Sequence, residues 1–220
     1  MEPQFWKERW SAGQIGFHQG AVHEDLAREG ERWLGPSPTG VLVPLCGKSV
    51  DLAWLAERAP VLGVELVESA VEAFFAERGW SPERAPWGEY TAFRAPERPG
   101  LTVLNGDVFA LPSLGEVLGD ISHVWDRAAL VALPRPMRAT YAAMLRRLLP
   151  GARLLLNTFD VGPDQGQGPP FSVTGDEVRA LYAGCALAET HRTLSEPSPG
   201  VKARGVTELL TLTFEITLAP

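Results

Sequence analysis

The chain has 220 residues, of which 45% are hydrophobic and 21% are charged, and this composition is typical of a folded globular protein. Its formal net charge of −7 excludes the generally basic surface with which proteins bind the phosphates of nucleic acids. We therefore expect a folded protein with no nucleic-acid partner.

Two short amphipathic helices are predicted near the N-terminus, because large apolar side chains recur there at helical spacing. These side chains are Phe5, Trp6, Trp10, Val22, Leu26 and Trp33. The unbroken apolar run 41–45 then predicts a buried strand, and 61–65 predicts a second one. A helix is expected after each of these strands, the second over 70–78.

The rest of the chain is expected to continue this alternation. Residues 79–100 contain four prolines and are expected to form a loop. Further strands are predicted over 101–104, 121–125 and 154–156, and further helices over 138–149 and 176–182. A Gly- and Pro-rich loop is expected at 161–172 and a long Thr-rich β segment at 206–218.

Apolar strands that alternate with helices predict an α/β fold, a Rossmann-like and mostly parallel sheet with helices on both faces. We expect a single domain over 1–220, in which 1–38 form an N-terminal helical lid and 39–220 form the Rossmann-like core. In such sheets the ligand binds beyond the carboxyl ends of the strands. The residues that follow each predicted strand are therefore the candidates for chemistry.

Three of these residues together favour a ligand that contains adenosine. Gly47 lets a ligand approach the backbone in the turn after the first strand. Glu65 closes the second strand 18 residues later, where an acid accepts hydrogen bonds from ribose hydroxyls, and Asp107 follows the third strand, where an acid can meet an adenine edge. Since the turn has neither the dinucleotide-binding nor the Walker A glycine spacing, these positions do not distinguish a nicotinamide dinucleotide from S-adenosylmethionine.

The predicted fourth strand ends in Trp125-Asp126-Arg127. Arg127 either forms a structural ion pair with Asp126 or holds an anionic group of the ligand, because a guanidinium makes directed, bidentate contacts with carboxylates. The aromatic side chains before residue 18 either pack in the core or stack over the ligand as a lid that excludes water.

Two further features are expected to be structural. Cys46 is a candidate nucleophile, but no base is predicted near it, and we expect a small packed turn residue. His18 and His23 are five residues apart with Gly20 between them, so we expect no metal site. The chain also has no Gly-x-Ser-x-Gly elbow, which argues against an α/β-hydrolase.

Several segments between residues 5 and 171 resemble, in order, those of the thiopurine S-methyltransferase family. They are Phe5-Trp6-x3-Trp10, Ile15-Gly16-Phe17-His18-Gln19, Val43 to Asp51, Gly63-Val64-Glu65, Trp125 to Ala132 and Gly168-Pro169-Pro170-Phe171. The turn 44–48 and the strand end 125–127 are unusual motifs, and their joint occurrence makes the resemblance specific. It implies a class I methyltransferase whose cofactor is S-adenosyl-L-methionine.

The resemblance also implies roles in cofactor binding. Together with the strand-end argument, it marks Trp10, Leu45, Gly47, Glu65, Asp107, Val108 and Arg127 as cofactor-binding residues. Trp10 is expected to pack against the cofactor, Leu45 to line its pocket and Glu65 to hold the ribose hydroxyls. Asp107, followed by Val108, stands near the adenine in place of a small polar residue that is common in relatives.

On the acceptor side, the resemblance implies substrate-binding roles for Phe17, as an aromatic stacking surface, and for Arg127, which is also the expected catalytic residue. It implies methyl transfer to the thiol of an aromatic heterocycle such as a thiopurine, and also to selenium or tellurium species. After residue 185 the chain departs from the family: Arg204, with Lys202 nearby, stands where some relatives have an aromatic residue.

Three alternative functions stay open. A halide or small-thiol methyltransferase would have the same fold and cofactor. A nicotinamide-dependent oxidoreductase would share Gly47 and Glu65 but should show a fuller glycine fingerprint. A module that senses S-adenosylmethionine without turnover is the non-enzymatic alternative.

The sequence also predicts where the protein acts and with what. There are two cysteines, an acid at the second position and no apolar run near the ~20 residues that span a bilayer. We therefore expect a cytoplasmic protein with no secretory signal and no membrane partner. The expected partner is a small-molecule thiol or selenol acceptor, and the expected state is a monomer.

Overall fold

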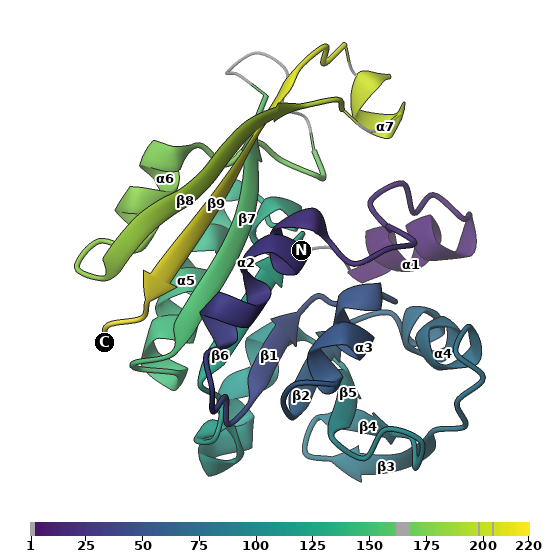
Figure 1. Cartoon of the computed structure of the whole chain (residues 1–220). Helices are drawn as coiled ribbons and strands as arrows, with labels where there is room; N and C mark the ends of the chain where they lie inside the picture. Colours follow the sequence, from purple (N-terminus) through teal and green to yellow (C-terminus); the bar gives the residue numbers. More distant parts are fainter. Residues whose placement is uncertain (1–2, 162–167, 198, 204) are drawn as a thin grey trace. The chain divides into compact units, whose positions relative to one another are not determined.

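The computed structural model describes residues 3–161, 168–197, 199–203 and 205–220. The chain divides into two compact units, Glu2–His123 and Val124–Pro220, which we call the first and the second unit. Figure 1 shows the helices and strands of both units. None of the described helices is long and apolar enough to cross a membrane.

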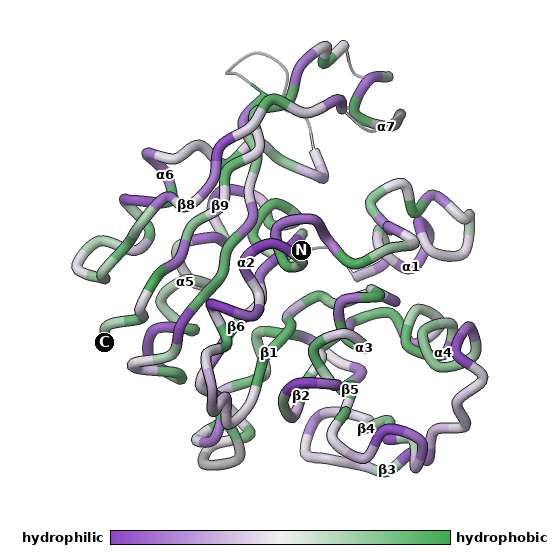
Figure 2. The backbone as a smooth tube through the Cα atoms, in the orientation of Figure 1, coloured by the Kyte–Doolittle hydropathy of each residue, from purple (hydrophilic) through white to green (hydrophobic). Residues whose placement is uncertain are grey.

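The sheet of the first unit is built on three parallel strands, β1 (Val41–Pro44), β2 (Val61–Glu65) and β5 (Leu101–Asn105). β1 pairs with β2 and β2 pairs with β5, both in parallel, as the apolar runs predicted. β1 and β2 are buried along their whole length, and β1 is mostly green in Figure 2. Burial on both faces explains why these strands are apolar up to Glu65, the last residue of β2.

The predicted loop at 79–100 is wrong, because two strands form there: β3 (Glu83–Trp87) and β4 (Tyr90–Arg94). They make an antiparallel hairpin, and β4 also pairs antiparallel with β5. Pro86 is tolerated because β3 is an exposed edge strand, where a missing N–H breaks no inner ladder. Of the four prolines only Pro86 lies in a strand, and the other three lie outside β3 and β4.

The helices of the first unit are α1 (Pro3–Ser11), α2 (Glu24–Leu34), α3 (Val50–Ala56) and α4 (Glu68–Ala76), followed by the unpredicted 3-10 segment η1 (Val108–Leu118). The two predicted N-terminal helices are confirmed as α1 and α2. α3 and α4 pack on β2 and β5. α2 and α3 are capped by His23 and Ser49, whose side chains accept hydrogen bonds from Asp25 N and Asp51 N.

The second unit is dominated by three long antiparallel strands: β7 (Arg153–Asp160), β9 (Leu209–Thr217) and β8 (Ala186–Ser195), which lie in that order. They run side by side in green and yellow in Figure 1. Ahead of β7 come β6 (His123–Arg127), η2 (Leu130–Ala132) and α5 (Arg135–Leu148). The remaining elements are α6 (Gly175–Leu181) and α7 (Pro199–Lys202).

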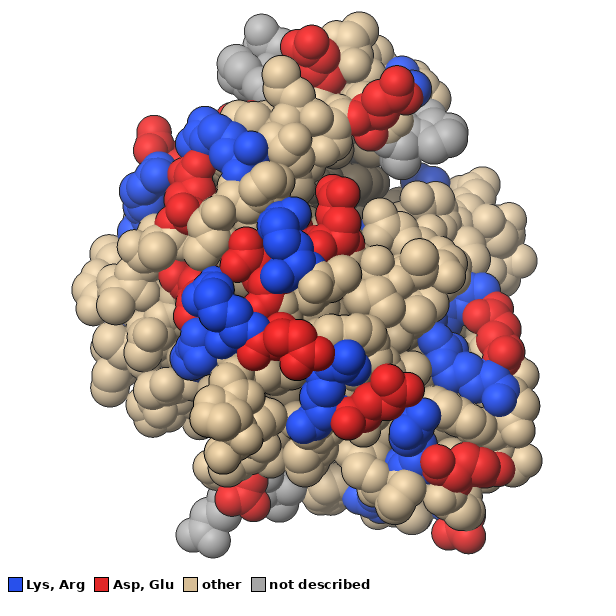
Figure 3. Space-filling view, in the orientation of Figure 1, with Lys and Arg blue, Asp and Glu red and all other residues tan. Residues whose placement is uncertain are grey.

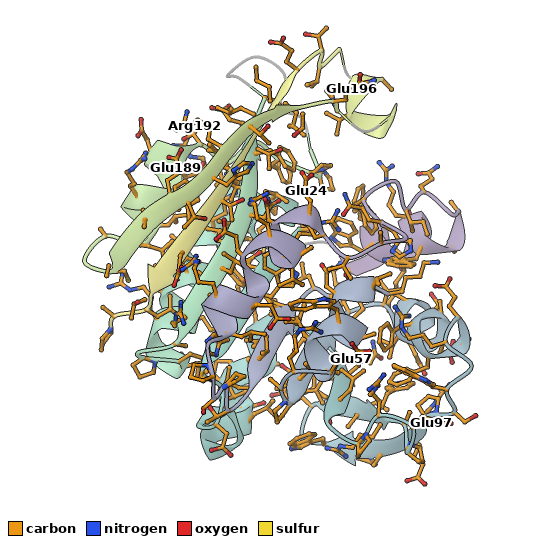
Figure 4. All side chains as sticks on the ribbon, viewed as in Figure 1. Glu24, Glu57, Glu97, Glu189, Arg192 and Glu196 are labelled. Atoms are coloured by element: carbon orange, nitrogen blue, oxygen red, sulfur yellow. The ribbon has the colours of Figure 1, made fainter. Side chains whose placement is uncertain are left out.

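β8 was not predicted, because no residue on it is fully buried and its apolar pattern is weak. It is an edge strand with a register shift between Glu189 and His191. Figure 4 labels Glu189 and Arg192 on this strand, where the guanidinium Nε donates to the carboxylate at 2.6 Å. Charges and a bulge on an edge strand disfavour pairing with another chain. Figure 3 likewise shows acidic and basic side chains next to one another on the face in view.

Candidate functional site

Parallel pairing in the first unit brings three strand ends to one edge of the sheet. Pro44 lies opposite Val64 in the β1–β2 pair, and Glu65 lies opposite Asn105 in the β2–β5 pair. The turn after β1, the last residue of β2 and the loop after β5 are therefore neighbours. This is the arrangement expected from the order of the strands in the sequence.

Glu65 holds this edge together through both oxygens of its carboxylate. Oε2 accepts a hydrogen bond from Gly47 N at 2.8 Å, and Oε1 accepts one from Val67 N at 2.8 Å. The side chain is 7% exposed, and burial raises the pKa of its carboxyl, against the lowering effect of the hydrogen bonds from Val67 and Gly47. Each carboxylate oxygen has a further lone pair, so Glu65 can accept ligand hydroxyls while it holds the turn.

The turn after β1 leaves little room for side chains. Leu45 and Gly47 have positive φ angles of 48° and 53°. A Cβ added to Gly47 would lie 3.1 Å from Cζ2 of Trp10, so the indole of α1 packs directly on the turn. Lys48 Nζ forms an ion pair with Glu77 Oε1 and thereby ties the turn to the end of α4. Gly47 is thus required both by its backbone conformation and by its contact with Trp10.

The environment of Cys46 does not support a role as a nucleophile. Its side chain is buried, and burial together with nearby Glu65 raises the pKa of the thiol well above its ordinary value. The thiol therefore stays protonated, and protonated thiols are poor nucleophiles. Its sulfur would lie 3.0 Å from a Cβ on Gly63 of β2, which identifies Cys46 as a packing residue of the turn.

An aromatic cluster of the first unit extends from the turn into the N-terminal segment. Phe17 packs edge-on against Trp10 and against Trp6, each with ring centroids 5.8 Å apart, and Trp6 packs on Phe5 at 5.3 Å. The indole Nε1 of Trp6 is buried without a hydrogen-bond partner among the described residues. A buried N–H without a partner is costly in the absence of a ligand that accepts from it.

The loop after β5 is tied to the end of β2. Gly106 N donates to Glu65 O at 2.9 Å, and Asn105 Nδ2 donates to Glu65 O at 3.0 Å and to Leu66 O at 3.1 Å. Asp107 is exposed, and its Oδ1 accepts a hydrogen bond from Phe109 N at 3.0 Å. Val108, beside it, is buried. Asn105 follows the predicted strand 101–104 and so was among the candidate positions, but sequence reasoning gave a role only to Asp107 and Val108, because a lone amide belongs to no sequence motif.

Arg127 is the one predicted site residue that belongs to the second unit. It ends β6 and is half-buried, and Ala128 after it has a positive φ of 73°. Asp126 directs its carboxylate to other groups: Oδ1 accepts from Leu130 N at 3.1 Å and Oδ2 from the Tyr141 hydroxyl at 2.9 Å. Burial raises the pKa of Asp126 to about 6. Asp126 thus holds the turn that follows Arg127.

The remaining candidates have local roles in the structure. His23 caps α2, and its backbone N–H donates to Asp51 Oδ1 at 2.9 Å. In the described part of the chain no group of three or more His, Cys, Asp or Glu side chains is arranged to hold a metal ion. Lys202 forms an exposed ion pair with Glu196, and Arg204 lies outside the described residues.

Comparison with known proteins identifies the family. The family described as "Thiopurine S-methyltransferase (TPMT)" matches residues 1–217. The chain belongs to this family. It is 43% identical to the thiopurine S-methyltransferase of Bordetella petrii over 98% of both chains. It is 44% identical to that of Pseudomonas entomophila over 99% of this chain and 100% of the relative.

Solved structures of more distant proteins share the fold. A 1,6-didemethyltoxoflavin-N1-methyltransferase of Burkholderia thailandensis is 19% identical, with a TM-score of 0.62 over 98% of this chain and 87% of its own. A TehB-like methyltransferase of Corynebacterium glutamicum is 16% identical, with a TM-score of 0.53 over 96% of both chains. The predicted α/β fold is confirmed, with a mixed, largely parallel core sheet and an N-terminal helix.

The family assignment decides between the functions that the sequence left open. The protein is an S-adenosylmethionine-dependent methyltransferase, so the expected enzyme class and cofactor are confirmed. A nicotinamide-dependent oxidoreductase and a sensor without turnover are set aside.

Proposed function

We propose that this methyltransferase transfers the methyl group of S-adenosylmethionine to the thiol of an aromatic heterocycle of the thiopurine kind, and also to selenium or tellurium species. The observation that carries the proposal is the Gly47–Glu65 clamp with the aromatic cluster of Trp6, Trp10 and Phe17 packed onto it. Relatives 43–48% identical are named for the thiopurine reaction.

The residues of the first unit fit the cofactor. Glu65 offers carboxylate lone pairs to the ribose hydroxyls, and Gly47 lets the indole of Trp10 pack closely on the turn beside it. Half-buried Leu45 supplies apolar surface, and exposed Asp107 supplies an acceptor for the adenine. The buried N–H of Trp6 supplies a donor that the described residues leave unpartnered and that an anionic or carbonyl oxygen of a ligand satisfies.

The chemistry makes modest demands on the protein. When bound, S-adenosylmethionine supplies an electrophilic methyl group that a thiolate attacks in line with the departing sulfur. The chain's own task is to orient the acceptor and exclude water, which contributes through proximity and needs no general base. Phe17, half-buried between two indoles, offers a flat acceptor a face to stack on.

We assign Arg127 to the anionic acceptor and to the methionine end of the cofactor, with the catalytic task of steering or stabilising the thiolate. Its position at a strand end and its rigid turn, fixed by Asp126, support this role. Arg127→Ala should lower turnover while leaving the affinity for S-adenosylhomocysteine mostly intact. The matched control is Arg192→Ala on β8, and a turnover equal to that of the control would remove Arg127 from the reaction.

The first experiment is a calorimetric titration with S-adenosylhomocysteine, which tests the cofactor without a choice of acceptor. One-to-one binding at micromolar concentration is expected. A panel of thiopurines, aromatic thiols, small aliphatic thiols, halide, selenite and tellurite then tests the acceptor. Turnover of halide or small thiols alone would favour the alternative of a halide or small-thiol methyltransferase.

We further propose that 1–220 act as one cytoplasmic, monomeric methyltransferase domain, with 1–38 as a lid. α1 has no buried residue, which supports movement of the start of this segment, whereas Leu26 and Trp33 of α2 are fully buried and hold the later part in place. Proteolysis before residue 20 should slow when S-adenosylhomocysteine is added. Equal cleavage rates with and without it would contradict the lid.

A further inference from the structure

Tyr90 of the β3–β4 hairpin reaches the loop that follows β5. Its ring is 3% exposed, and its hydroxyl donates a hydrogen bond to the backbone oxygen of Asp107 at 2.8 Å. Burial, with Asp107 and Glu89 nearby, raises the pKa of Tyr90, so the hydroxyl keeps its proton and remains a donor. The hairpin therefore holds Asp107 by its main chain.

The ring of Tyr90 also fills the space beside Gly106. A Cβ added to Gly106 would lie 2.5 Å from Cδ1 and 2.9 Å from Cε1 of Tyr90, closer than real Cβ atoms approach. Gly106 does not have a positive φ, so the backbone conformation does not require a glycine at this position. The close contact with the ring of Tyr90 does require one. Tyr90 and Gly106 thus interlock directly before Asp107.

The loop is held from the β2 side as well, through Asn105 Nδ2 and Gly106 N, which donate to backbone oxygens of Glu65 and Leu66. The Asp107 carboxylate is exposed, and one of its oxygens accepts from Phe109 N. No other donor to this carboxylate is present among the described residues. The main chain at Asp107 is therefore held both by Tyr90 of the hairpin and by the end of β2, while the Asp107 carboxylate keeps lone pairs that can accept from a ligand.

We propose that Tyr90 is a specificity-determining positioning residue, which fixes Asp107 so that its carboxylate accepts from the exocyclic amino group of the cofactor's adenine. This inference rests on the proposed placement of the adenine at Asp107. An ionised carboxylate only accepts hydrogen bonds, so it binds a base that has an amino group at this position and repels one that has a carbonyl oxygen there. Tyr90 itself touches no ligand and acts through the loop.

The test compares the binding of S-adenosylhomocysteine with that of S-inosylhomocysteine, in which a 6-oxo group replaces the 6-amino group. The native protein is expected to prefer the amino compound at least tenfold. Tyr90→Phe keeps the ring but removes one hydrogen bond, and it should reduce this preference about threefold to tenfold while affinity for the 6-oxo compound stays constant. The matched control is Tyr182→Phe, because the buried Tyr182 hydroxyl has no partner among the described residues.

The outcomes separate this inference from the proposed function. If the native protein binds neither compound, the cofactor placement itself fails. If it binds both equally, or if Tyr90→Phe weakens both to the same extent or neither, the positioning role of Tyr90 is overturned. Thermal unfolding verifies that the variant is folded. Should it not be, Gly106→Ala, which displaces the same ring from the loop, must show the same loss of preference.

Discussion

Glu65 in the first unit and Asp126 in the second are two acids at strand ends that the structure uses differently. Both accept two hydrogen bonds and hold the turn beside them, and burial raises the pKa of both. Glu65 accepts only from backbone N–H groups and is 7% exposed, whereas Asp126 is 0% exposed and receives the Tyr141 hydroxyl. An acid at a strand end can bind a ligand only where its carboxylate remains accessible.

The second unit also relies on a buried cation, where the first unit relies on backbone donors. Arg138 of α5 is 3% exposed and donates to Leu133 O at 2.9 Å and to Ser172 O at 3.0 Å. Its Nη1 also lies 2.9 Å from both carboxylate oxygens of Glu177. Arg138 thus joins α5 to α6 and to the segment after the Gly-Pro-Pro-Phe motif. Substitution of Glu65 should therefore act mainly on ligand affinity, and substitution of Arg138 mainly on stability.

The largest effect is expected for Arg138→Ala. Removing one partner of a buried ion pair leaves Glu177 and two backbone oxygens without their donor, which should lower the free energy of unfolding by about 3–5 kcal/mol. Urea unfolding measures this loss. Arg192→Ala, on the exposed edge strand, is the control and should lose far less. Equal losses in the two variants would contradict the role of the buried pair.

The titration of Asp126 should make the free energy of unfolding depend on pH. Its pKa is raised from 3.8 to about 6, so the folded state holds this proton more tightly than the unfolded state. The free energy of unfolding should consequently fall as the pH rises from about 4 to about 6, by about 3 kcal/mol for this group, and then level off. Asp126→Asn should remove this slope.

The variant Tyr141→Phe tests whether Asp126 is the group that titrates. The Tyr141 hydroxyl lowers the pKa of Asp126 by its hydrogen bond, so its removal should extend the falling part of the stability profile to higher pH. Unfolding curves at several pH values measure both variants. A profile of Asp126→Asn that parallels the native one would show that another group titrates.

An effect on ligand affinity is expected for Glu65→Ala. The loss of a charge-assisted hydrogen bond to the ribose should weaken the binding of S-adenosylhomocysteine by roughly 1–3 kcal/mol. Calorimetry measures the change, with Glu189→Ala on β8 as a control that alters an acid outside the proposed site. Native affinity in Glu65→Ala would remove this residue from the cofactor site.

The smallest effect is expected for Gly47→Ala, compared with Gly13→Ala. Both glycines have positive φ angles, 53° and 65°, so both variants should lose about 1 kcal/mol of stability through backbone strain. Only at Gly47 does the new Cβ meet Trp10, whereas nothing lies within 4 Å at Gly13. We therefore expect only Gly47→Ala to lower the affinity for S-adenosylhomocysteine, by a few-fold. An equal change in both would show that Trp10 does not contribute.

The elements that were predicted correctly share a local signal. β1, β2 and β5 are short apolar runs, buried along most of their length, so composition alone identifies them. β3 and β8 are edge strands, with side chains mostly exposed or half-buried, and they exist because a neighbouring strand offers hydrogen bonds. β4 follows β3 after only Gly88 and Glu89, but β3 contains Pro86 and no buried residue, so its pattern does not indicate a strand. The neighbour of β8 is β9, which lies further along the chain beyond α7, so no local pattern reveals that pairing.

The sequence by itself determined the family, the fold class and the positions of the apolar strands β1, β2 and β5, because residue type and apolar runs are local properties of the chain. It also put forward Gly47, Glu65 and Asp107 as candidates for ligand binding. Only the tertiary structure decided which polar groups already have partners. It engages Asp126 with Tyr141, leaves the Trp6 N–H without a partner among the described residues, and brings Tyr90 to Asp107 across a hairpin. Exposure and hydrogen-bond partners depend on residues far apart in sequence, and such contacts exist only once the chain has packed.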